Sequence, residues 1–261
     1  GTVVQQAQAA VAFEGGWDRT NMTTQNLETF FDGVNGLGVG INGNSLAAFF
    51  NKLHTYRYGI GCRVGIASVL GTIYTGGNGS SSGLAMLDNA GTGSIAGTIN
   101  KVISFGDTYT VDFTTNVDFV YGNSITDLIS IGAANTALNL TGQNFTCFGN
   151  NLGIGGAVTV LNSGNPGIHT NTKACGQSFG DVTVKYSASH GVSLNSAYGA
   201  ENNTFKSITS NNNTLSGINF QSGGNFIGGG STTGNGSGGI LCVAGSANIV
   251  PYVNALRNFT I

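Results

Sequence analysis

Two acidic side chains in the C-terminal third of the chain could do acid–base chemistry. Asp181 follows an aromatic–glycine pair, and Glu201 follows the turn-like run "NSAYGA". Two carboxyl groups held roughly 5 to 10 Å apart can hydrolyse a glycosidic bond, because one protonates the leaving oxygen while the other attacks the sugar or activates water. The alternative for Asp181 is a solvated ion pair with a lysine on the same face, such as Lys185. Asp181 and Glu201 are therefore the candidate catalytic residues.

Aromatic and amide side chains in the same region could bind a sugar. The rings of Tyr186 and Tyr198 could stack on the face of a pyranose. Side-chain amides both donate and accept hydrogen bonds, so they suit hydroxyl groups. The amides expected to point outward here are those of Asn195, Asn219 and Gln221. These five residues are the candidate ligand contacts.

No pattern in the sequence indicates a cofactor or fixes a metal site. Four aspartates could form a carboxylate patch or a calcium site, namely Asp107, Asp112, Asp118 and Asp127. The spacings of the EF-hand loop and of the glycine-rich calcium repeat are both absent, which argues against calcium. His190 precedes a glycine and is expected to be a turn residue that hydrogen-bonds the backbone. We therefore predict neither metal nor cofactor.

The four cysteines are widely spaced and contain no C-x-x-C pair, so a zinc site is not expected. They are Cys62, Cys147, Cys175 and Cys242. Free, buried thiols that behave as small hydrophobic groups are the main prediction. A disulfide between Cys147 and Cys175 is the alternative.

The composition indicates an ordered chain with an uncharged surface. Only 8% of the 261 residues are charged and the net charge is −2, while 44 residues are glycine. Nine lysines and arginines without a cluster cannot neutralise a run of phosphates, which excludes a nucleic-acid partner. No membrane span is expected, because every apolar run is far shorter than the hydrocarbon core requires. The chain begins without methionine and is expected to be processed or cut from a longer protein.

A repeat in the last third would position these residues. The pentads "GVSLN", "GINFQ" and "GILCV" begin at Gly191, Gly217 and Gly239. An aromatic residue precedes each pentad at a nearly constant distance, namely Phe179, Phe205 and Phe226. A regular period of this length, built from short, β-prone segments, indicates a β-solenoid, in which each period is one rung paired in parallel with its neighbours.

Alternation along the pentads predicts which side chains form the core. The inward positions are Val192, Ile218 and Ile240, followed by Leu194, Phe220 and Cys242. The outward positions are Ser193, Asn219 and Leu241, followed by Asn195, Gln221 and Val243. Leu241 and Val243 interrupt the polar outer columns and are the candidate partner contacts. The leading glycines are expected to occupy corners with positive φ, and asparagines to stack as ladders.

The N-terminal segment 1–57 differs from the rest and is expected to be mostly helical. Helix formers and apolar side chains at helical spacing occur over 3–13, 23–34 and 44–56. This segment is expected to be a cap, an attachment element or a subunit contact. The β-rich texture begins at about Arg63, so the predicted boundaries are 1–57 for the helical segment and 63–261 for the solenoid, with the clearest rungs over 144–261.

The run "NNTFKSITSNNNTLSGINFQ" followed by "GNFIGGG" resembles the right-handed parallel β-helix proteins of the pectin-lyase-like fold. Phage tailspikes and many polysaccharide-acting enzymes share that fold. The resemblance covers 140–261 well and 63–140 weakly, and it implies an all-β, right-handed parallel β-helix. It also implies a homo-oligomer, with a trimer expected. The metal-binding aspartate cluster of the pectate lyases has no convincing match here.

Three functions are compatible with these observations. The first is a virion or cell-surface structural module, of tailspike or tail-fibre type, that contacts host surface polysaccharide and binds other surface proteins through residues 1–57. The second is a polysaccharide hydrolase or lyase on the same fold. The third is an adhesin or surface-array protein of a cell. Sparse charge and polar outer columns favour the first, located on a virion or outside a cell.

Overall fold

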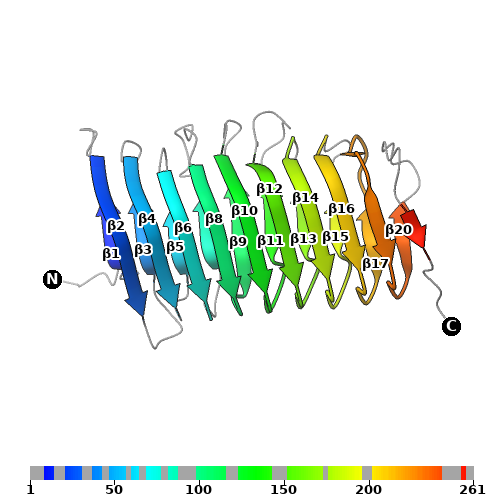
Figure 1. The fold of residues 1–261 in the computed structure, drawn as a ribbon, viewed down its shortest axis with the longest axis horizontal. Coiled ribbons are helices and arrows are strands. Elements are labelled where there is room, and N and C mark those ends of the chain that lie inside the picture. The colour runs from blue at the N-terminus through cyan, green and yellow to red at the C-terminus, as the bar shows by residue number, and fades with distance from the viewer. Residues whose placement is uncertain are drawn as a thin grey trace.

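The chain forms a parallel β-solenoid in a computed structural model (Figure 1). The structure describes residues 9–14, 21–30, 37–42, 47–56, 60–64, 69–77, 82–87, 98–115, 123–142, 152–172, 176–195, 202–242 and 254–256. Each rung contributes one strand to each of two sheets, so that successive rungs stack along the long axis and the core lies between the sheets (Figure 1). No helix long and apolar enough to cross a membrane occurs in these described residues.

The two sheets are parallel throughout their described pairings. The first sheet, called sheet A here, has the order β1 (Ala9–Glu14), β3 (Leu37–Asn42), β5 (Ile60–Val64), β7 (Ser82–Leu87), β9 (Tyr109–Thr115), β11 (Leu138–Gly142), β13 (Ile168–Thr172), β15 (Val192–Asn195), β17 (Ser216–Phe220) and β20 (Gly238–Cys242). The second sheet, sheet B, has the order β2 (Asn21–Phe30), β4 (Ala47–Tyr56), β6 (Val69–Gly76), β8 (Thr98–Phe105), β10 (Asn123–Ile131), β12 (Leu152–Leu161), β14 (Ser178–Lys185), β16 (Thr204–Asn211), β19 (Gly230–Thr233) and β21 (Asn254–Leu256), with the short β18 (Phe226–Ile227) also paired to β16.

The helices expected near the N-terminus are wrong for the described residues, which form strands. β2 covers part of the expected helix over 23–34, and β4 covers most of the one over 44–56. These two strands pair in parallel with each other, and β4 pairs with β6. The solenoid therefore extends to Ala9, well before the predicted boundary at Arg63. A role of residues 1–57 in attachment stays a prediction.

The three pentads are equivalent strands of successive rungs, as predicted. Val192 pairs with Ile218 and Ile218 with Ile240, in β15, β17 and β20. Val192 and Ile218 are fully buried, and Ile240 is partly buried against the same core. Leu194 and Phe220 are also fully buried. The alternation of the pentads therefore identified the inner face of sheet A correctly.

Cys242 does not lie in the core, which corrects the prediction of a buried thiol. It pairs with Phe220 and has the inward parity, but it is exposed and free. β20 is the last strand of sheet A in the described chain, so Cys242 has no following strand of that sheet to cover it. Cys147 and Cys175 lie outside the described residues, so their disulfide stays a prediction.

In the described chain, the corners after β6, β8, β10, β12, β14, β16 and β19 begin with a left-handed residue, and from β8 onward a buried residue follows it. The left-handed residues have φ between 56° and 69° and are Gly77, Gly106, Gly132, Asn162, Tyr186, Asn212 and Gly234. From Gly77 to Asn212, their amides donate to the last carbonyl of the next strand, as from Tyr186 to Asn211 and from Asn212 to Thr233. Glycine and asparagine reach this region at low cost, which explains most of the column.

The buried residues of the same corner form the predicted asparagine ladder. Asn213 Oδ1 accepts the Ser187 amide at 3.0 Å, and Asn235 Oδ1 accepts both the amide and Nδ2 of Asn213 at 3.0 and 2.9 Å. All three residues are at most 2% exposed. Because a buried amide without a partner costs about 1–3 kcal/mol, this ladder satisfies backbone groups that the corner removes from water.

The leading glycines of the pentads are required for space, which corrects the expectation of positive φ. Gly191 and Gly217 are absent from the positive-φ residues. A Cβ on Gly191 would lie 2.7 Å from the Gly217 carbonyl oxygen, and a Cβ on Gly217 would lie 2.8 Å from the Gly239 carbonyl oxygen. Both distances are below normal contact. The glycine column therefore lets successive backbones approach one another at this corner.

The aromatic column of the sequence repeat holds for two rungs and slips in the third. Phe179 and Phe205 pair in register, and their rings stack with centroids 4.6 Å apart. Phe205 then pairs with Ile227 instead of Phe226. Ile227 is fully buried and Phe226 is 39% exposed. A slip of one residue moves a side chain to the opposite face of a strand, which accounts for the change.

Candidate functional site

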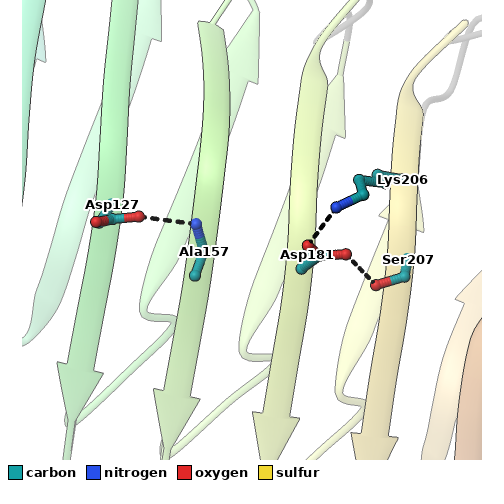
Figure 2. A network of polar contacts seen from close by, with 5 residues as sticks. All are labelled: Asp127, Ala157, Asp181, Lys206 and Ser207. Carbon is teal, nitrogen blue, oxygen red and sulfur yellow. Dashed lines mark hydrogen bonds and ion pairs between the residues drawn. The ribbon is translucent and has the colours of Figure 1, made fainter.

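Asp181 lies on the outer side of sheet B and is held by its neighbours on β16 (Figure 2). Its carboxylate accepts from Lys206 Nζ at 2.7 Å and from Ser207 Oγ at 2.7 Å. Both side chains of the ion pair are more than half exposed. The cation is therefore Lys206 of the next rung and not Lys185, which the sequence suggested. Asp181 therefore forms a surface ion pair, which is the alternative to a catalytic role that the sequence left open.

The hydrogen bond from Lys206 lowers the pKa of Asp181, and the bond from Ser207 acts in the same direction. Burial has a small opposing effect, and the charge of Lys206 adds to the lowering. A general acid must hold its proton near neutral pH, so its pKa has to be raised. Asp181 is thus unsuited to be the acid of a glycosidase pair and could serve only as a carboxylate.

Asp127 is a second carboxylate on the outer side of sheet B, and it has a structural role (Figure 2). Its Oδ1 accepts the backbone amide of Ala157 at 2.9 Å, where β12 carries a bulge relative to both neighbouring strands. A Cβ on Gly156 would collide with the same carboxylate. Because a bulge removes amides from the ladder, Asp127 supplies the missing acceptor.

Asp127 and Asp181 do not form a facing pair. They belong to β10 and β14, with β12 between them, so their backbones are roughly 9 to 10 Å apart. Figure 2 shows the carboxylate of Asp127 turned toward Ala157 and that of Asp181 turned toward β16. Neither carboxylate points at the other across β12. Glu201, the predicted partner of Asp181, lies outside the described residues.

The predicted ligand contacts are distributed over different surfaces. Tyr186 is 54% exposed at the left-handed corner after β14. Asn195 is half-buried at the end of β15, and Gln221 is exposed just after β17. Asn195 and Gln221 belong to the sheet A side, whereas Asp181 lies on sheet B. The structure therefore does not join the predicted catalytic and ligand-binding residues in one site.

Asn219 is not an exposed contact, which corrects its prediction as one. It has the outward parity, yet it is only 1% exposed, and Ser193 beside it is 4% exposed. Asn219 Nδ2 donates to Ser193 Oγ at 3.4 Å. The outer side of β15 and β17 is thus covered at this point. Leu241, the next residue of the column, is 46% exposed as predicted; Tyr198 and Val243 lie outside the described residues.

The four aspartates considered for calcium are dispersed. Asp107 is fully buried at a corner, where it accepts from Thr75 Oγ1 at 2.5 Å and Ser104 Oγ at 2.6 Å. Asp112 and Asp127 lie on different sheets, and Asp118 is outside the described residues. Within the described ranges, no group of three or more histidine, cysteine or acidic side chains could hold a metal ion.

A polar column on the outside of sheet A is the best candidate site. Asp112, Asn139 and His169 align on β9, β11 and β13 and are called the outer ladder here. The residues on either side of His169, Ile168 and Thr170, are fully buried in the solenoid. All three ladder side chains are half-buried, and Asn139 Nδ2 donates to Asp112 Oδ1 at 2.9 Å. The column continues into the covered Ser193 and Asn219.

The pKa of His169, in the outer ladder, lies below its ordinary value. Burial lowers its pKa most strongly, a hydrogen bond with the Ser193 backbone raises it, and His190 lowers it further. The imidazole is therefore neutral at pH 7 and can both donate and accept. Its buried Nδ1 has no hydrogen-bond partner within the protein, and neither has Asn219 Oδ1. The ladder thus offers a carboxylate, an amide and a neutral imidazole.

His190 behaves as the sequence predicted. Its Nδ1 accepts the backbone amide of Ser216 at 3.1 Å. Burial lowers its pKa. The residue therefore closes a turn in one rung by bonding the backbone of the next.

Sequence reasoning missed the outer ladder because its steps along the chain are unequal. The steps along the chain from Asp112 to Asn139, from Asn139 to His169 and from His169 to Ser193 all differ in length. A fixed period cannot align such positions. The available signal was local: each residue follows or precedes an apolar position in a short β-prone run, as in "TVDF", "ALNL" and "GIHT".

We expect acid to destabilise the fold through His169 and His190. Their folded pKa values lie below the ordinary value, so below a pH of about 6.5 the unfolded chain binds more protons than the folded one. The free energy of unfolding then falls with decreasing pH, by at most about 1.4 kcal/mol per unit and histidine, until the folded pKa is reached. Urea unfolding of the natural chain and His169→Gln at pH 7, 6 and 5 measures it.

The variant should lose less stability over this range than the natural chain. Two curves that fall in parallel between pH 7 and 5 would show that His169 does not contribute. Comparing both proteins at pH 7 first separates the loss of the ring from the loss of the titration.

Comparison of the chain with protein-family models, with curated proteins and with solved structures found no match in any of the three. The fold therefore rests on the strand pairing described above. The function has to be argued from the side chains that this fold presents.

Proposed function

We propose that the chain is a structural module of a virion or cell surface that contacts polysaccharide along the outer ladder. The observation that supports this proposal is the alignment of Asp112, Asn139 and His169, one side chain per rung, on the outside of sheet A. Hydroxyl-rich ligands are recognised by a few polar groups placed at fixed distances on a rigid surface. Strands of a solenoid provide such a surface.

The spacing of the ladder suits a polymer more than a small sugar. Neighbouring strands are about 4.8 Å apart, which is close to the length of one pyranose unit. A polysaccharide lying along the solenoid axis would meet one ladder residue per sugar. Asp112 would accept from a hydroxyl and Asn139 would donate and accept, while the neutral, half-buried ring of His169 would pack beside the polymer.

A polysaccharide hydrolase or lyase is the second candidate function. The observation that favours it is the shared outer surface of Asp127 and Asp181 on sheet B. Against it stand the contacts of Asp127 with Ala157 and of Asp181 with Lys206, which occupy both carboxylates. We therefore rank the binding module first.

Glycan-array binding of the full chain tests the proposal, followed by affinity measurement for any polysaccharide retained. Asn139→Ala and His169→Ala should each weaken binding about tenfold, the effect of losing one or two hydrogen bonds or the packing of a ring against the ligand. Asn100→Ala is the matched control, because Asn100 is an exposed amide on β8 of sheet B. Equal affinity of all four proteins would contradict the proposal.

The two candidate functions differ in their products. A reducing-end assay on the bound polysaccharide should give no release with the natural chain. Release that disappears in Asp181→Asn would instead identify the enzyme. Binding that is unchanged in Asp181→Asn agrees with a site on sheet A.

A further inference from the structure

The outer side of sheet B carries an apolar strip between β6 and β12. Its members are Tyr74, Ile103, Phe105, Ile129, Ile131 and Leu161, called the apolar face here. Phe105 is 52% exposed, and the others are half-buried. Farther along the same columns the residues become polar, as in Thr183 and Thr209. The strip therefore belongs to the middle of the solenoid and is not a general property of the fold.

These side chains do not belong to the core. Ile103 lies between the fully buried Val102 and Ser104, and Ile129 lies between Leu128 and Ser130, which are also fully buried. Alternation places Ile103 and Ile129 on the opposite side of the strands. A contiguous apolar surface of this kind usually marks a contact with another molecule.

A column of charged residues borders the apolar face along one edge. Lys52, Thr72, Lys101 and Asp127 align on β4, β6, β8 and β10, and Ala157 and Asp181 follow on β12 and β14. The charges change sign halfway: lysines lie toward the N-terminal rungs and aspartates toward the C-terminal rungs. In β6, β8, β10 and β16 two consecutive residues are not buried here, so the charges form a rim beside the face.

We propose that two copies of this chain associate through the apolar face, with their solenoid axes antiparallel. The two-fold axis would run parallel to the strands between β8 and β10, in the plane of the interface. This operation places β8 of one copy over β10 of the other, and β6 over β12. The interface is isologous, so each contact occurs twice.

Charge complementarity specifies a second copy as the partner. Under this two-fold axis Lys101 faces Asp127 of the other copy at the same height on the strands. Lys52 comes to the height of Asp181, whose carboxylate it would share with Lys206 of that copy. A parallel arrangement about an axis along the solenoid would instead bring each rung against the same rung, without pairing these opposite charges. The sign change along the rim therefore fits the antiparallel pair.

The apolar residues are complementary under the same operation. Ile103 meets Ile129 and Phe105 meets Ile131, since these pairs are in register on β8 and β10. Gly76 meets Leu161, so a large aliphatic side chain of β12 faces a residue without a side chain. Apolar contacts in the centre and charges at the rim are the arrangement of ordinary protein interfaces.

Molar mass by light scattering over a wide range of concentrations is the first test. The natural chain should form a dimer, and Phe105→Ser should raise its dissociation constant about tenfold or more. Leu215→Ser is the matched control, because Leu215 is an exposed apolar residue outside the apolar face. A monomer at every concentration, a trimer, or a dimer lost in Leu215→Ser and kept in Phe105→Ser would overturn the proposal.

Mixing two charge variants tests the pairing between copies. Lys101→Glu alone places two acids opposite each other, and Asp127→Lys alone places two lysines opposite each other, so each should dimerise about tenfold more weakly. Their mixture restores both attractive pairs. Native mass spectrometry should then show mainly the mixed dimer, provided circular dichroism shows that both variants are folded.

Cysteine cross-linking decides between antiparallel and parallel contacts without weakening the interface charges. In a Cys242→Ser background, Ile103→Cys and Ile129→Cys should form a disulfide when mixed and little when each is oxidised alone. Cross-linking of each variant with itself would show a parallel arrangement and overturn the proposal. The Cys242→Ser background alone measures cross-linking through the other cysteines.

Discussion

Replacing Gly191 with alanine should lower the free energy of unfolding by about 3 kcal/mol. The new Cβ would lie 2.7 Å from the carbonyl oxygen of Gly217 and 2.7 Å from Asn213 Nδ2, and closer still to Ser210 Oγ. The first of these atoms belongs to the backbone of the next rung, so it cannot move without separating the rungs. Urea unfolding at constant pH measures the change.

The same substitution would also disturb the polar corner. Ser210 Oγ donates to the Gly217 carbonyl at 2.7 Å and accepts from Asn213 Nδ2 at 3.0 Å. Moving Ser210 away from the new methyl group breaks both bonds inside the solenoid, where their loss is costly. The destabilisation therefore has a steric and a polar part, which act in the same direction.

Gly155→Ala is the matched control for Gly191→Ala. Gly155 is exposed, and a Cβ there would meet no atom within 4 Å. The unfolding free energy of this variant should change by less than about 1 kcal/mol. Equal midpoints for the two variants would show that the glycine column has no close-packing role.

The C-terminal rungs could be predicted from sequence because their strands follow a simple alternation. Val192, Ile218 and Ile240 were aligned by their leading glycines alone, and the structure pairs them in that register. The period is nearly constant there, and a polar residue separates each pair of apolar ones. The local sequence pattern and the tertiary pairing agree in these strands, so the strands can be predicted from the sequence.

The N-terminal strands of sheet B could not be predicted because a strand with an interrupted alternation has the apolar spacing of a helix. In sheet B the buried residues Ile99 and Val102 are three positions apart, as are Phe205 and Ile208. A spacing of three is also the spacing of an apolar helix face. Phe50 and Leu53 align with Leu70 and Ile73, and these with Ile99 and Val102.

This spacing therefore predicts a helix, although in these strands it reflects two consecutive residues between buried ones. Only pairing with neighbouring rungs distinguishes the two structures, and that pairing is non-local. Intrinsic helix preference is a weak signal and tertiary contacts override it here.

The candidate site was predicted less well than the fold because burial on the outer side depends on the whole molecule. Alternation correctly placed Asn219 and Leu241 on the same side of sheet A. It could not show that Asn219 is covered while Leu241 is exposed. Likewise, the cation of Asp181 comes from the next rung, and the length of the repeat does not identify it without the register.

Phe205→Ala should destabilise the fold by about 3–5 kcal/mol, the cost of removing a fully buried phenyl ring. Phe205 is completely buried, and its ring stacks on Phe179 with centroids 4.6 Å apart. The substitution leaves a cavity beside Phe179 and also removes the stacking contact. Thermal melting and urea unfolding should both report the loss.

Phe226→Ala tests whether the loss of stability expected for Phe205→Ala arises from the core position or from the residue type. Phe226 occupies the third place of the aromatic repeat, but the one-residue slip leaves it 39% exposed while Ile227 fills the core. Its removal should cost about 0.5–1 kcal/mol, as for a partly exposed side chain outside the core. If Phe226→Ala were as damaging as Phe205→Ala, the aromatic column would run through all three rungs, and the register of β16 with β18 would be wrong.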